Sequence, residues 1–442
     1  MLSPRRRMEV TMAHDIGVWL FDQPVGTLSL VGGRLSFQYH VDWLVQPDAV
    51  ALSQSLPLGP DAFDDHQCRA FFAGLLPEGN LRRLIAQQCQ VSSQNDFALL
   101  SAIGGECAGA ITFVPQGQPV ATAEQAGVEW LDEPQLMALL DELPRRPMLA
   151  GRDGVRLSLA GAQDKLPVLF DGQRIGLPIG GQPSTHILKP AIASVEDSVL
   201  NECFCLALAQ AMGLPTAQAQ ILDVQGRQVL LVARYDRRVS VDGQTERIHQ
   251  EDFCQALGVV PEMKYQNEGG PDLKACFDLL RKATRPSAPQ VLRLLDAVVF
   301  NALIGNHDAH AKNFSLLYAG QSNNAAPTLA PLYDMLCTAV YDHLTPKMAM
   351  KLGSQYKFTE VQARHWEQFA QAAGLSKAQT KKRVLQIAQQ LPAVARRIQA
   401  TPPFAGRTII AKMVELTDHR AALTIRRLTE GEPDTQLDDE DA

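Results

Sequence analysis

The 442-residue sequence has few aromatic residues and no long hydrophobic run. Aromatic residues make up only 6% of the chain and charged residues 20%, against 46% hydrophobic residues. This balance is ordinary for globular proteins and excludes the disordered and fibrous classes. No apolar run approaches the ~20 residues that cross a bilayer, because Asp296 and Asn301 interrupt the run from Leu294 to Ile304. We therefore expect a cytoplasmic protein with no membrane partner.

The sequence also lacks the features of a disulfide-rich protein, of a nucleic-acid binder and of a secreted protein. Its eight cysteines form no Cys-x-x-Cys pair and lie mostly in apolar surroundings, which is typical of reduced core thiols. The net charge of -7 argues against strong DNA binding by the whole chain, because phosphate binding needs a basic surface. The arginines between Met1 and Met8 are not followed by the apolar run of a signal peptide, and Met8 or Met12 are alternative initiators.

The most informative stretch runs from Gly305 to Ser315 and reads Gly-Asn-His-Asp-Ala-His-Ala-Lys-Asn-Phe-Ser. Asp308 and Asn313 lie five positions apart, as the proton-accepting Asp and the Mg²⁺-binding Asn do in a protein-kinase catalytic loop. Two apolar stretches joined by a turn then lead to Asp334, where a kinase has a further metal-binding Asp. These three side chains are candidates for a site that holds Mg²⁺ and phosphates.

Two other interpretations of this stretch remain open. A loop rich in Asn, Asp and His also serves as a polar connection that caps a helix, here the apolar run from Val291 to Ile304. A zinc hydrolase is another alternative, because His307, Asp308 and His310 are possible Zn²⁺ ligands. Against zinc, no further His or Cys lies nearby in the sequence to complete a familiar ligand set.

Upstream segments supply the other parts that a kinase needs. The turn from Ala160 to Lys165, between predicted strands at 155–159 and 166–170, could lay backbone N–H groups over phosphates, although a plain β-hairpin fits it as well. The predicted strand at 185–190 carries Lys189 and the predicted helix at 198–212 carries Glu202. A kinase pairs such residues, with an attraction of about 4 kcal/mol before desolvation. Alternatively, Lys189 lies at the end of a surface strand and Glu202 lies on a solvated helix face.

The length suggests about three domains of ~150 residues. We expect a β meander plus helices in residues 1–147, a mixed β/α section in 148–238, a helical section in 239–430 and an acidic, disordered tail in 431–442. Strands at 217–223 and 228–234 should lead into a hinge at Tyr235 to Arg238. Further helices are expected at 250–257, 271–283, 291–304, 360–373, 377–400 and 407–428.

Together, and in this order, these residues resemble the HipA toxin kinases of bacterial HipBA toxin–antitoxin modules. The resemblance is carried by Phe71 to Gly79, Leu157 to Lys165, Thr185 to Lys189, Tyr235 to Arg238, His249 to Asp252, Asp308 to Ser315 and Tyr333-Asp334. It implies an α+β, two-lobed protein-kinase-like fold with an additional N-terminal β/α subdomain and a helical C-terminal lobe. It also implies serine/threonine phosphorylation of a protein with ATP and Mg²⁺.

The resemblance further implies a role for individual residues. Asp308 would be the catalytic base, Asn313 and Asp334 the metal ligands, and Glu202 the ion-pair partner of Lys189. The implied nucleotide-binding residues are Ala160, Gly161, Ala162, Gln163, Asp164, Lys165, Lys189, Arg234, Tyr235, Gln250, His310 and Lys312. Ser158 falls on the serine that family members autophosphorylate to inactivate themselves. Ala233 and Asp164 stand where other members have Glu.

The partners that the resemblance implies are a helix-turn-helix, HipB-like antitoxin dimer and, through it, operator DNA. The protein would then be nucleoid-associated while it is in that complex. The phosphorylated protein would be an aminoacyl-tRNA synthetase, namely glutamyl-tRNA synthetase in the best-known members, so that translation stops. The alternative is a kinase-like binding module that acts with its antitoxin chiefly as a repressor scaffold.

Overall fold

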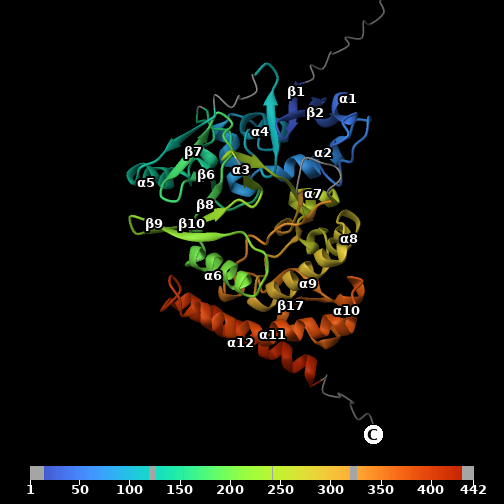
Figure 1. Ribbon diagram of the computed structural model, residues 1–442, viewed down its shortest axis with the longest axis vertical. Coiled ribbons are helices and arrows are strands. Elements are labelled where there is room, and N and C mark those ends of the chain that lie inside the picture. Colours follow the sequence, from blue (N-terminus) through green and yellow to red (C-terminus); the bar gives the residue numbers. More distant parts are fainter. Residues whose placement is uncertain (1–13, 119–125, 153, 241, 319–325, 431–442) are drawn as a thin grey trace, which may run out of the picture.

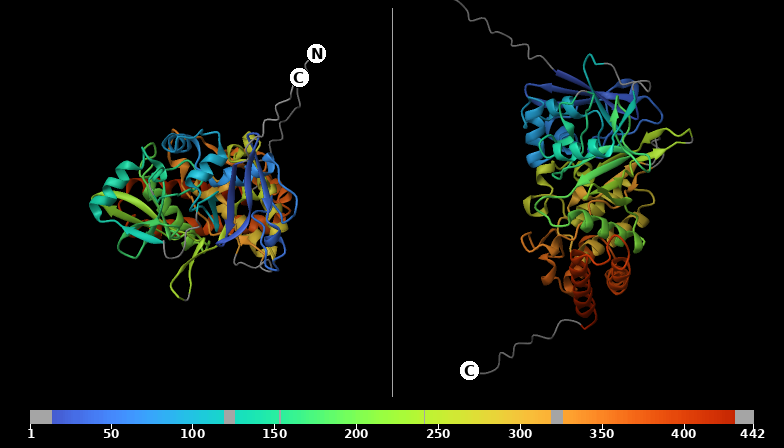
Figure 2. Two further views of the ribbon diagram at one scale, coloured as in Figure 1. Left: turned by 90° about the horizontal axis from the view of Figure 1, so that it is seen from above. Right: turned by 90° about the vertical axis from the view of Figure 1, so that its left-hand side faces the viewer.

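The computed structural model describes residues 14–118, 126–152, 154–240, 242–318 and 326–430. The acidic tail expected at 431–442 and the alternative initiators Met8 and Met12 lie outside these residues. The described chain is elongated, with its four-stranded and six-stranded sheets toward one end and the C-terminal helices at the other (Figures 1 and 2). Helices and strands are both abundant and largely segregated, as in α+β proteins.

The N-terminal part is an antiparallel sheet covered by helices. The sheet has the order β3-β2-β1-β4 and consists of β1 (His14–Leu20), β2 (Gln23–Val31), β3 (Arg34–Tyr39) and β4 (Ile111–Pro115). The meander predicted over its first three strands is confirmed. Val18, Leu28 and Phe37 alternate with more exposed neighbours and are fully buried. The helices of this part are α1 (Val41–Leu44), α2 (Asp65–Phe72), α3 (Gly79–Gln88) and α4 (Asp96–Ile103).

A second sheet of six strands follows in the order β5-β7-β6-β8-β10-β9. Its strands are β5 (Gly127–Trp130), β6 (Leu166–Phe170), β7 (Ile175–Ile179), β8 (His186–Pro190), β9 (Ala219–Val224) and β10 (Arg227–Ala233), and helices α5 (Glu133–Glu142) and α6 (Ser198–Ala211) pack against it. The strand expected over 155–159 is wrong, because Leu157 makes only an isolated bridge to Glu106. Strand β5 joins this sheet although it precedes the division expected at residue 147.

The remaining residues form a mainly helical section. It contains β11 (Arg237–Val239), β12 (Thr245–Arg247), β13 (His249–Asp252), α7 (Phe253–Leu257), α8 (Leu273–Ala283), α9 (Ser287–Ile304), β14 (Ser315–Tyr318), β15 (Thr328–Leu329), β16 (Lys347–Leu352), β17 (Gln355–Lys357), α10 (Ala363–Ala372), α11 (Lys377–Gln399) and α12 (Thr408–Thr429). The helix expected from Gln250 begins only at Phe253, because Gln250 to Asp252 pair with β14 as a strand. The Asp252 side chain then caps α7.

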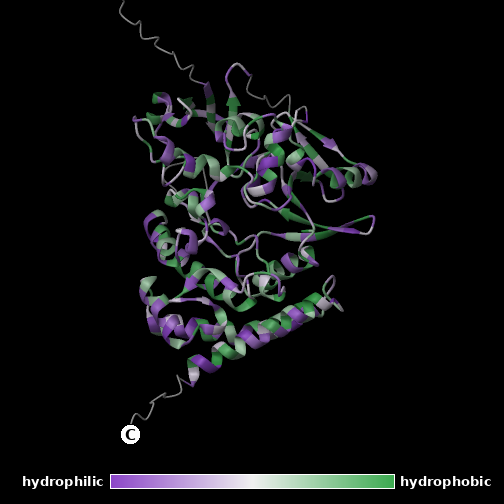
Figure 3. Cartoon of the chain, turned by 180° about the vertical axis from the view of Figure 1, so that it is seen from behind, coloured by the Kyte–Doolittle hydropathy of each residue, from purple (hydrophilic) through white to green (hydrophobic). Residues whose placement is uncertain are grey.

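Helix α9 is the central helix of this section. It packs against α8, α11 and α12, and the outward faces of α11 and α12 carry the polar residues (Figure 3). By length and composition α9 could cross a membrane, but most of it is buried inside the fold, which is the pattern of a core helix. Its C-terminus leads directly into the Asp308 loop.

Candidate active site

One lysine bridges two carboxylates at the centre of the site. Lys189 Nζ lies 2.6 Å from Glu202 Oε1 on α6 and 2.8 Å from Asp334 Oδ1. The ion pair expected between Lys189 and Glu202 is therefore present, and both side chains are buried. Burial opposes ionisation of Asp334, but Lys189 and then Lys165 outweigh it and hold the pKa of this carboxyl well below its usual range.

Asp334 also has an unusual backbone conformation. Its φ is 55°, in the left-handed region that residues other than glycine rarely adopt. Such strain persists only where the surroundings enforce it, and it is common at functional sites. The residue with this conformation is the one whose carboxylate contacts Lys189.

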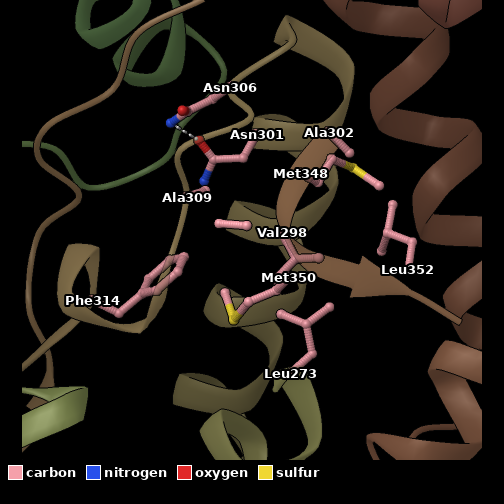
Figure 4. Close-up of a pocket in the computed structure, with 11 residues that line it drawn as sticks. Leu273, Val298, Asn301, Ala302, Asn306, Ala309, Phe314, Met348, Met350 and Leu352 are labelled. Atoms are coloured by element: carbon pink, nitrogen blue, oxygen red, sulfur yellow. Dashed lines mark hydrogen bonds between the residues drawn. The ribbon is translucent and has the colours of Figure 1, made fainter. Parts of the chain in front are cut away.

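The Asp308 loop is shaped by its own amide side chains. Gly305, with φ 79°, ends α9 in the left-handed conformation. Asn306 Oδ1 then accepts a hydrogen bond from the Asp308 backbone N–H at 3.1 Å, and Asn306 Nδ2 donates to Asn301 Oδ1 at 2.9 Å (Figure 4). Asn313 Nδ2 donates to the Asp308 carbonyl at 3.0 Å. These bonds hold the two residues that the spacing had singled out beside each other.

A small cavity lies behind this loop, between α9 and β16 (Figure 4). Its volume is about 30 Å³, and Ala309, Val298, Met348 and Met350 line it together with other mostly apolar residues. It is large enough for a water molecule but too small for a nucleotide. The Asp308 carboxyl is not part of its wall, so the cavity is not the site where phosphates would bind.

Asp308 is exposed to solvent. Tyr265 OH donates a hydrogen bond to its Oδ1 at 2.8 Å. Desolvation raises the pKa of Asp308, the Tyr265 hydrogen bond lowers it, and the nearby Asp334 carboxylate raises it again. A divalent cation would relieve the repulsion between the two carboxylates. The carboxylate and amide oxygens of Asp334 and Asn313 are of the type that Mg²⁺ prefers, so these residues fit a magnesium site.

The zinc alternative is not supported by the surroundings of its proposed ligands. In the described ranges, no group of three His, Cys, Asp or Glu side chains could hold a metal ion. His307 Nδ1 lies 3.1 Å from the Thr345 carbonyl, and its Nε2 lies 3.5 Å from the guanidinium of Arg420. Desolvation and then Arg420 lower the pKa of His307 to about 4. The buried guanidinium of Arg420 would repel a metal ion bound to His307.

The turn that runs from Ala160 through Ala162, Gln163 and Asp164 to Lys165 lies next to the lysine bridge, since both Asp334 and Lys189 act on the Lys165 amine. Gly161 has φ 105°, and a Cβ at this residue would lie 2.9 Å from Lys165 Nζ, so the glycine lets the amine fold over the turn. Desolvation lowers the pKa of Lys165 to about 8, with Asp334 raising it and Lys189 lowering it. The ammonium groups of Lys165 and Lys189 thus both lie near Asp334. A site that binds phosphates requires such a cluster of positive charge.

The N-terminal part holds this turn from the other side. The Glu78 N–H donates to the Gly161 carbonyl at 3.0 Å, and Pro77 bridges the same residue. Ser158 is fully buried, and its Oγ donates to the Leu75 carbonyl at 2.8 Å. In this conformation the Ser158 hydroxyl faces the N-terminal part and is inaccessible to solvent.

The hinge residues lie at a buried charged cluster. The Arg234 guanidinium is 3.1 Å from Glu106 and 2.7 Å from Asp236, while its backbone N–H donates to the Thr185 carbonyl. Tyr235 OH donates to Gln250 Oε1, and Gln250 Nε2 donates to Asp236 at 3.2 Å. The structure therefore brings Arg234, Tyr235 and Gln250 together, with the Arg234 side chain engaged in the ion cluster.

Glu106 is the residue of this cluster that sequence reasoning missed. Its carboxylate lies 2.8 Å from both Arg237 and Arg247, in addition to its contact with Arg234. Burial opposes ionisation, but the three guanidinium groups hold the pKa of Glu106 well below its usual range. Its backbone carbonyl accepts from the Ser158 N–H at 2.9 Å. Glu106 thus contacts the N-terminal part, the hinge and the segment before the turn from Ala160 to Lys165, which we call the phosphate turn.

The two remaining predicted residues of the Asp308 loop are buried. Lys312 Nζ lies 2.7 Å from Asp252 and 3.9 Å from Glu78. His310 packs edge-on against Tyr265, with ring centroids 5.2 Å apart, and its Nδ1 has no hydrogen-bond partner. Desolvation and then Lys264 lower the pKa of His310 to about 3, so its ring is neutral. Direct contact of Lys312 or His310 with a nucleotide stays a prediction.

Family models and known proteins match most of this chain. Residues 16–114 match the family model "HipA N-terminal domain", and residues 157–395 match "HipA-like C-terminal domain". The chain is 46% identical to "Putative kinase Y4mE" of Sinorhizobium fredii over 84% of this chain and 88% of that protein. It is 30% identical to "Serine/threonine-protein kinase toxin HipA" of Shewanella oneidensis over 90% of this chain and 92% of that protein.

A solved structure of a HipA protein has the same fold as this chain. HipA in a complex of Shewanella oneidensis HipA, HipB and operator DNA superposes with a TM-score of 0.79 at 26% identity, covering 94% of this chain and 97% of that chain. The expected α+β, kinase-like fold is thereby confirmed. Since both domain models match in order and the similarity extends over nearly the whole length, this chain belongs to the HipA family of kinases.

Proposed function

We propose that this protein is the toxin of a toxin–antitoxin module and acts as an ATP- and Mg²⁺-dependent serine/threonine protein kinase. The observation that carries the proposal is the Lys189 ammonium bridging Glu202 and Asp334, beside the loop of Asp308 and Asn313. A kinase needs this combination to grip phosphates and hold a metal. A protein that only binds partners has no need of a buried lysine shared by two carboxylates.

The chemistry assigns a separate task to each of these residues. Lys189 and Lys165 bind and orient the ATP phosphates. Asp308 accepts the proton of the substrate hydroxyl, whose oxygen attacks the γ-phosphorus while the bond to the β–γ bridging oxygen breaks and ADP leaves. Asn313 and Asp334 would hold Mg²⁺, which neutralises charge on the phosphates when it is bound. Backbone groups of the Tyr235 hinge would receive the adenine.

We also propose that the protein inactivates itself by phosphorylating Ser158, which is buried in this conformation. Its hydroxyl must leave the Leu75 carbonyl before it can reach a nucleotide, so the phosphate turn has to open. A phosphate on Ser158 adds a charge of about -1.5 to -2 and has no room in the buried position. The turn would then stay open, and Lys165 would no longer lie beside Lys189 and Asp334.

The partners are proposed from the HipA relative. Its solved structure contains HipB and operator DNA, and we infer that this chain likewise binds a helix-turn-helix antitoxin dimer and reaches DNA through it. A net charge of -7 fits a protein that leaves most phosphate contacts to its partner. The phosphorylated protein would be an aminoacyl-tRNA synthetase such as glutamyl-tRNA synthetase, in the cytoplasm. A second role as co-repressor in the DNA complex is compatible with catalysis.

The substrate can be found by comparing phosphoproteomes after brief induction of the wild-type protein and of Asp308→Asn. We expect a serine or threonine in a translation protein to be phosphorylated with the wild type alone. Identical phosphoproteomes in the two strains would contradict the proposed kinase function. A new phosphorylation on proteins outside translation would contradict only the proposed substrate class.

A further inference from the structure

The loop between α7 and α8, residues 258–272, brings one tyrosine onto Asp308. Tyr265 OH donates to Asp308 Oδ1 at 2.8 Å. No other donor in the described part of the chain forms a hydrogen bond to this carboxylate. Since Asp308 is exposed to solvent, this hydrogen bond is the polar contact that restrains rotation of its carboxylate. The position of Tyr265 therefore decides the direction in which the carboxylate points.

Tyr265 is itself held firmly by its loop. Its carbonyl accepts from the Gly270 N–H at 2.9 Å, and its ring packs against His310. The turn is so tight that a Cβ on Gly270 would lie 2.1 Å from the Met263 carbonyl oxygen. The next residue of the loop, Gln266, accepts from the Lys351 backbone N–H on β16 at 2.8 Å. The tyrosine thus has a fixed position independent of its contact with Asp308.

The same loop is tied to the N-terminal domain. Lys264 Nζ lies 2.7 Å from Glu78 Oε2, and both side chains are only 16% exposed. The Glu78 N–H donates to the Gly161 carbonyl of the phosphate turn. One residue of the N-terminal domain therefore contacts both the turn that would hold the phosphates and the loop that carries Tyr265.

We propose that Tyr265 is a positioning residue that fixes the orientation of the Asp308 carboxylate, and that Glu78 of the N-terminal domain holds Tyr265 in place through Lys264. This inference rests on the proposed kinase function. A carboxylate accepts about four hydrogen bonds, so Tyr265 on Oδ1 leaves Oδ2 for the hydroxyl of the protein substrate. Holding the base in one orientation lowers the entropic cost of reaching the reactive geometry.

The test uses Tyr265→Phe, which removes the hydroxyl and keeps the ring that packs on His310. We expect the maximal rate of phosphate incorporation into the chain from labelled Mg-ATP to fall about 10- to 100-fold, the value of a hydrogen bond to a charged group. The half-saturating ATP concentration should stay unchanged, and Lys264→Met should give a smaller loss in the same direction. The control is Tyr356→Phe on β17, whose hydroxyl bonds to no described residue, and it should match the wild type.

A double-mutant cycle separates positioning from a merely structural role. In an Asp308→Asn background, Tyr265→Phe should change the residual rate less than about twofold, because no base is left to orient. An equal loss in both backgrounds, or a wild-type rate for Tyr265→Phe alone, would overturn the inference about Tyr265. If Asp308→Asn alone reacts as fast as the wild type, the assignment of Asp308 as the catalytic base fails instead. Absence of phosphate incorporation by the wild type would contradict the proposed kinase function. Thermal unfolding of each variant verifies that its fold is intact.

Discussion

Lys189 and Asp334 are 145 positions apart in the sequence, yet Lys189 Nζ lies 2.8 Å from Asp334 Oδ1. The same amine donates to Glu202 at 2.6 Å. This one ammonium group therefore joins strand β8, helix α6 and the segment after β15. Because Lys189 and Glu202 are buried, their attraction is screened much less by water and salt than that of a surface pair.

Replacing Lys189 by Met should strongly destabilise the fold. The change leaves the buried Glu202 without a cation, and the free energy of unfolding should fall by about 3–5 kcal/mol. Urea denaturation measures this difference. The control is Lys274→Met, which breaks the exposed pair with Asp278 and should have little effect. Equal effects of the two variants would show that the Lys189 bridge does not stabilise the protein.

The Glu106→Gln variant tests the junction between the N-terminal domain and the hinge. It removes the charge that faces Arg234, Arg237 and Arg247, so the buried cluster keeps an excess of positive charge. We expect a loss of about 3–5 kcal/mol in the free energy of unfolding. Glu246→Gln is the matched control, because Glu246 pairs with an arginine at the surface. An unchanged urea midpoint for Glu106→Gln would refute the structural role assigned to this cluster.

Glu251 should give the protein a distinct pH dependence. This carboxyl is fully buried and accepts hydrogen bonds from Ser53, Gln54 and Tyr318. Burial raises its pKa from 4.5 to about 7 despite these bonds. As the pH rises above about 4.5 the unfolded chain loses this proton first, so the stability due to Glu251 falls until the pH passes about 7, by about 3 kcal/mol in total.

The Glu251→Gln variant carries no titrating group at this position and should lack that loss. The measurement is the free energy of unfolding of both proteins at pH 5 and pH 8. We expect the wild type to lose more stability than the variant between these two values. The interpretation is wrong if both proteins change by the same amount, because the other titrating groups are common to them.

The proposed antitoxin should supply most of the DNA affinity. Alone, this acidic chain should bind operator DNA weakly, and the complex should bind tightly with a steep dependence on salt, since affinity grows with the number of phosphates neutralised. Two copies should flank the antitoxin dimer with two-fold symmetry on a palindromic site. Gel-shift titration at several salt concentrations measures the DNA affinity of the chain alone and of the complex. Equal affinity and salt dependence for the chain alone would exclude the proposed division of roles.

The sequence made the centre of the site predictable because its residues follow a fixed order. Asp308 and Asn313 are recognisable by their spacing, and Lys189 and Glu202 by their places on a strand and on the following helix. The structure brings Lys189 and Glu202 together as expected. Their functional roles stay predictions that the variants above address.

The supporting residues were not predictable, because their contacts join distant parts of the chain. Glu106 meets arginines that lie 128 to 141 positions away, and Tyr265 sits in an irregular loop without periodicity. The same reason explains the error at Gln250, where pairing with β14 overrides a local helical pattern. Within the described residues, the short segment around Leu157 pairs through one isolated bridge, to Glu106, and not with a strand.

The most direct test of the account is the intact mass of the purified protein after incubation with Mg-ATP, for the wild type and for Asp308→Asn. The account predicts that the wild type gains one phosphate on Ser158. It also predicts that Asp308→Asn keeps its fold but reacts about 10² to 10⁴ times more slowly, the usual contribution of a positioned base. A variant that gains phosphate as fast as the wild type would contradict the assignment of Asp308 as the catalytic base.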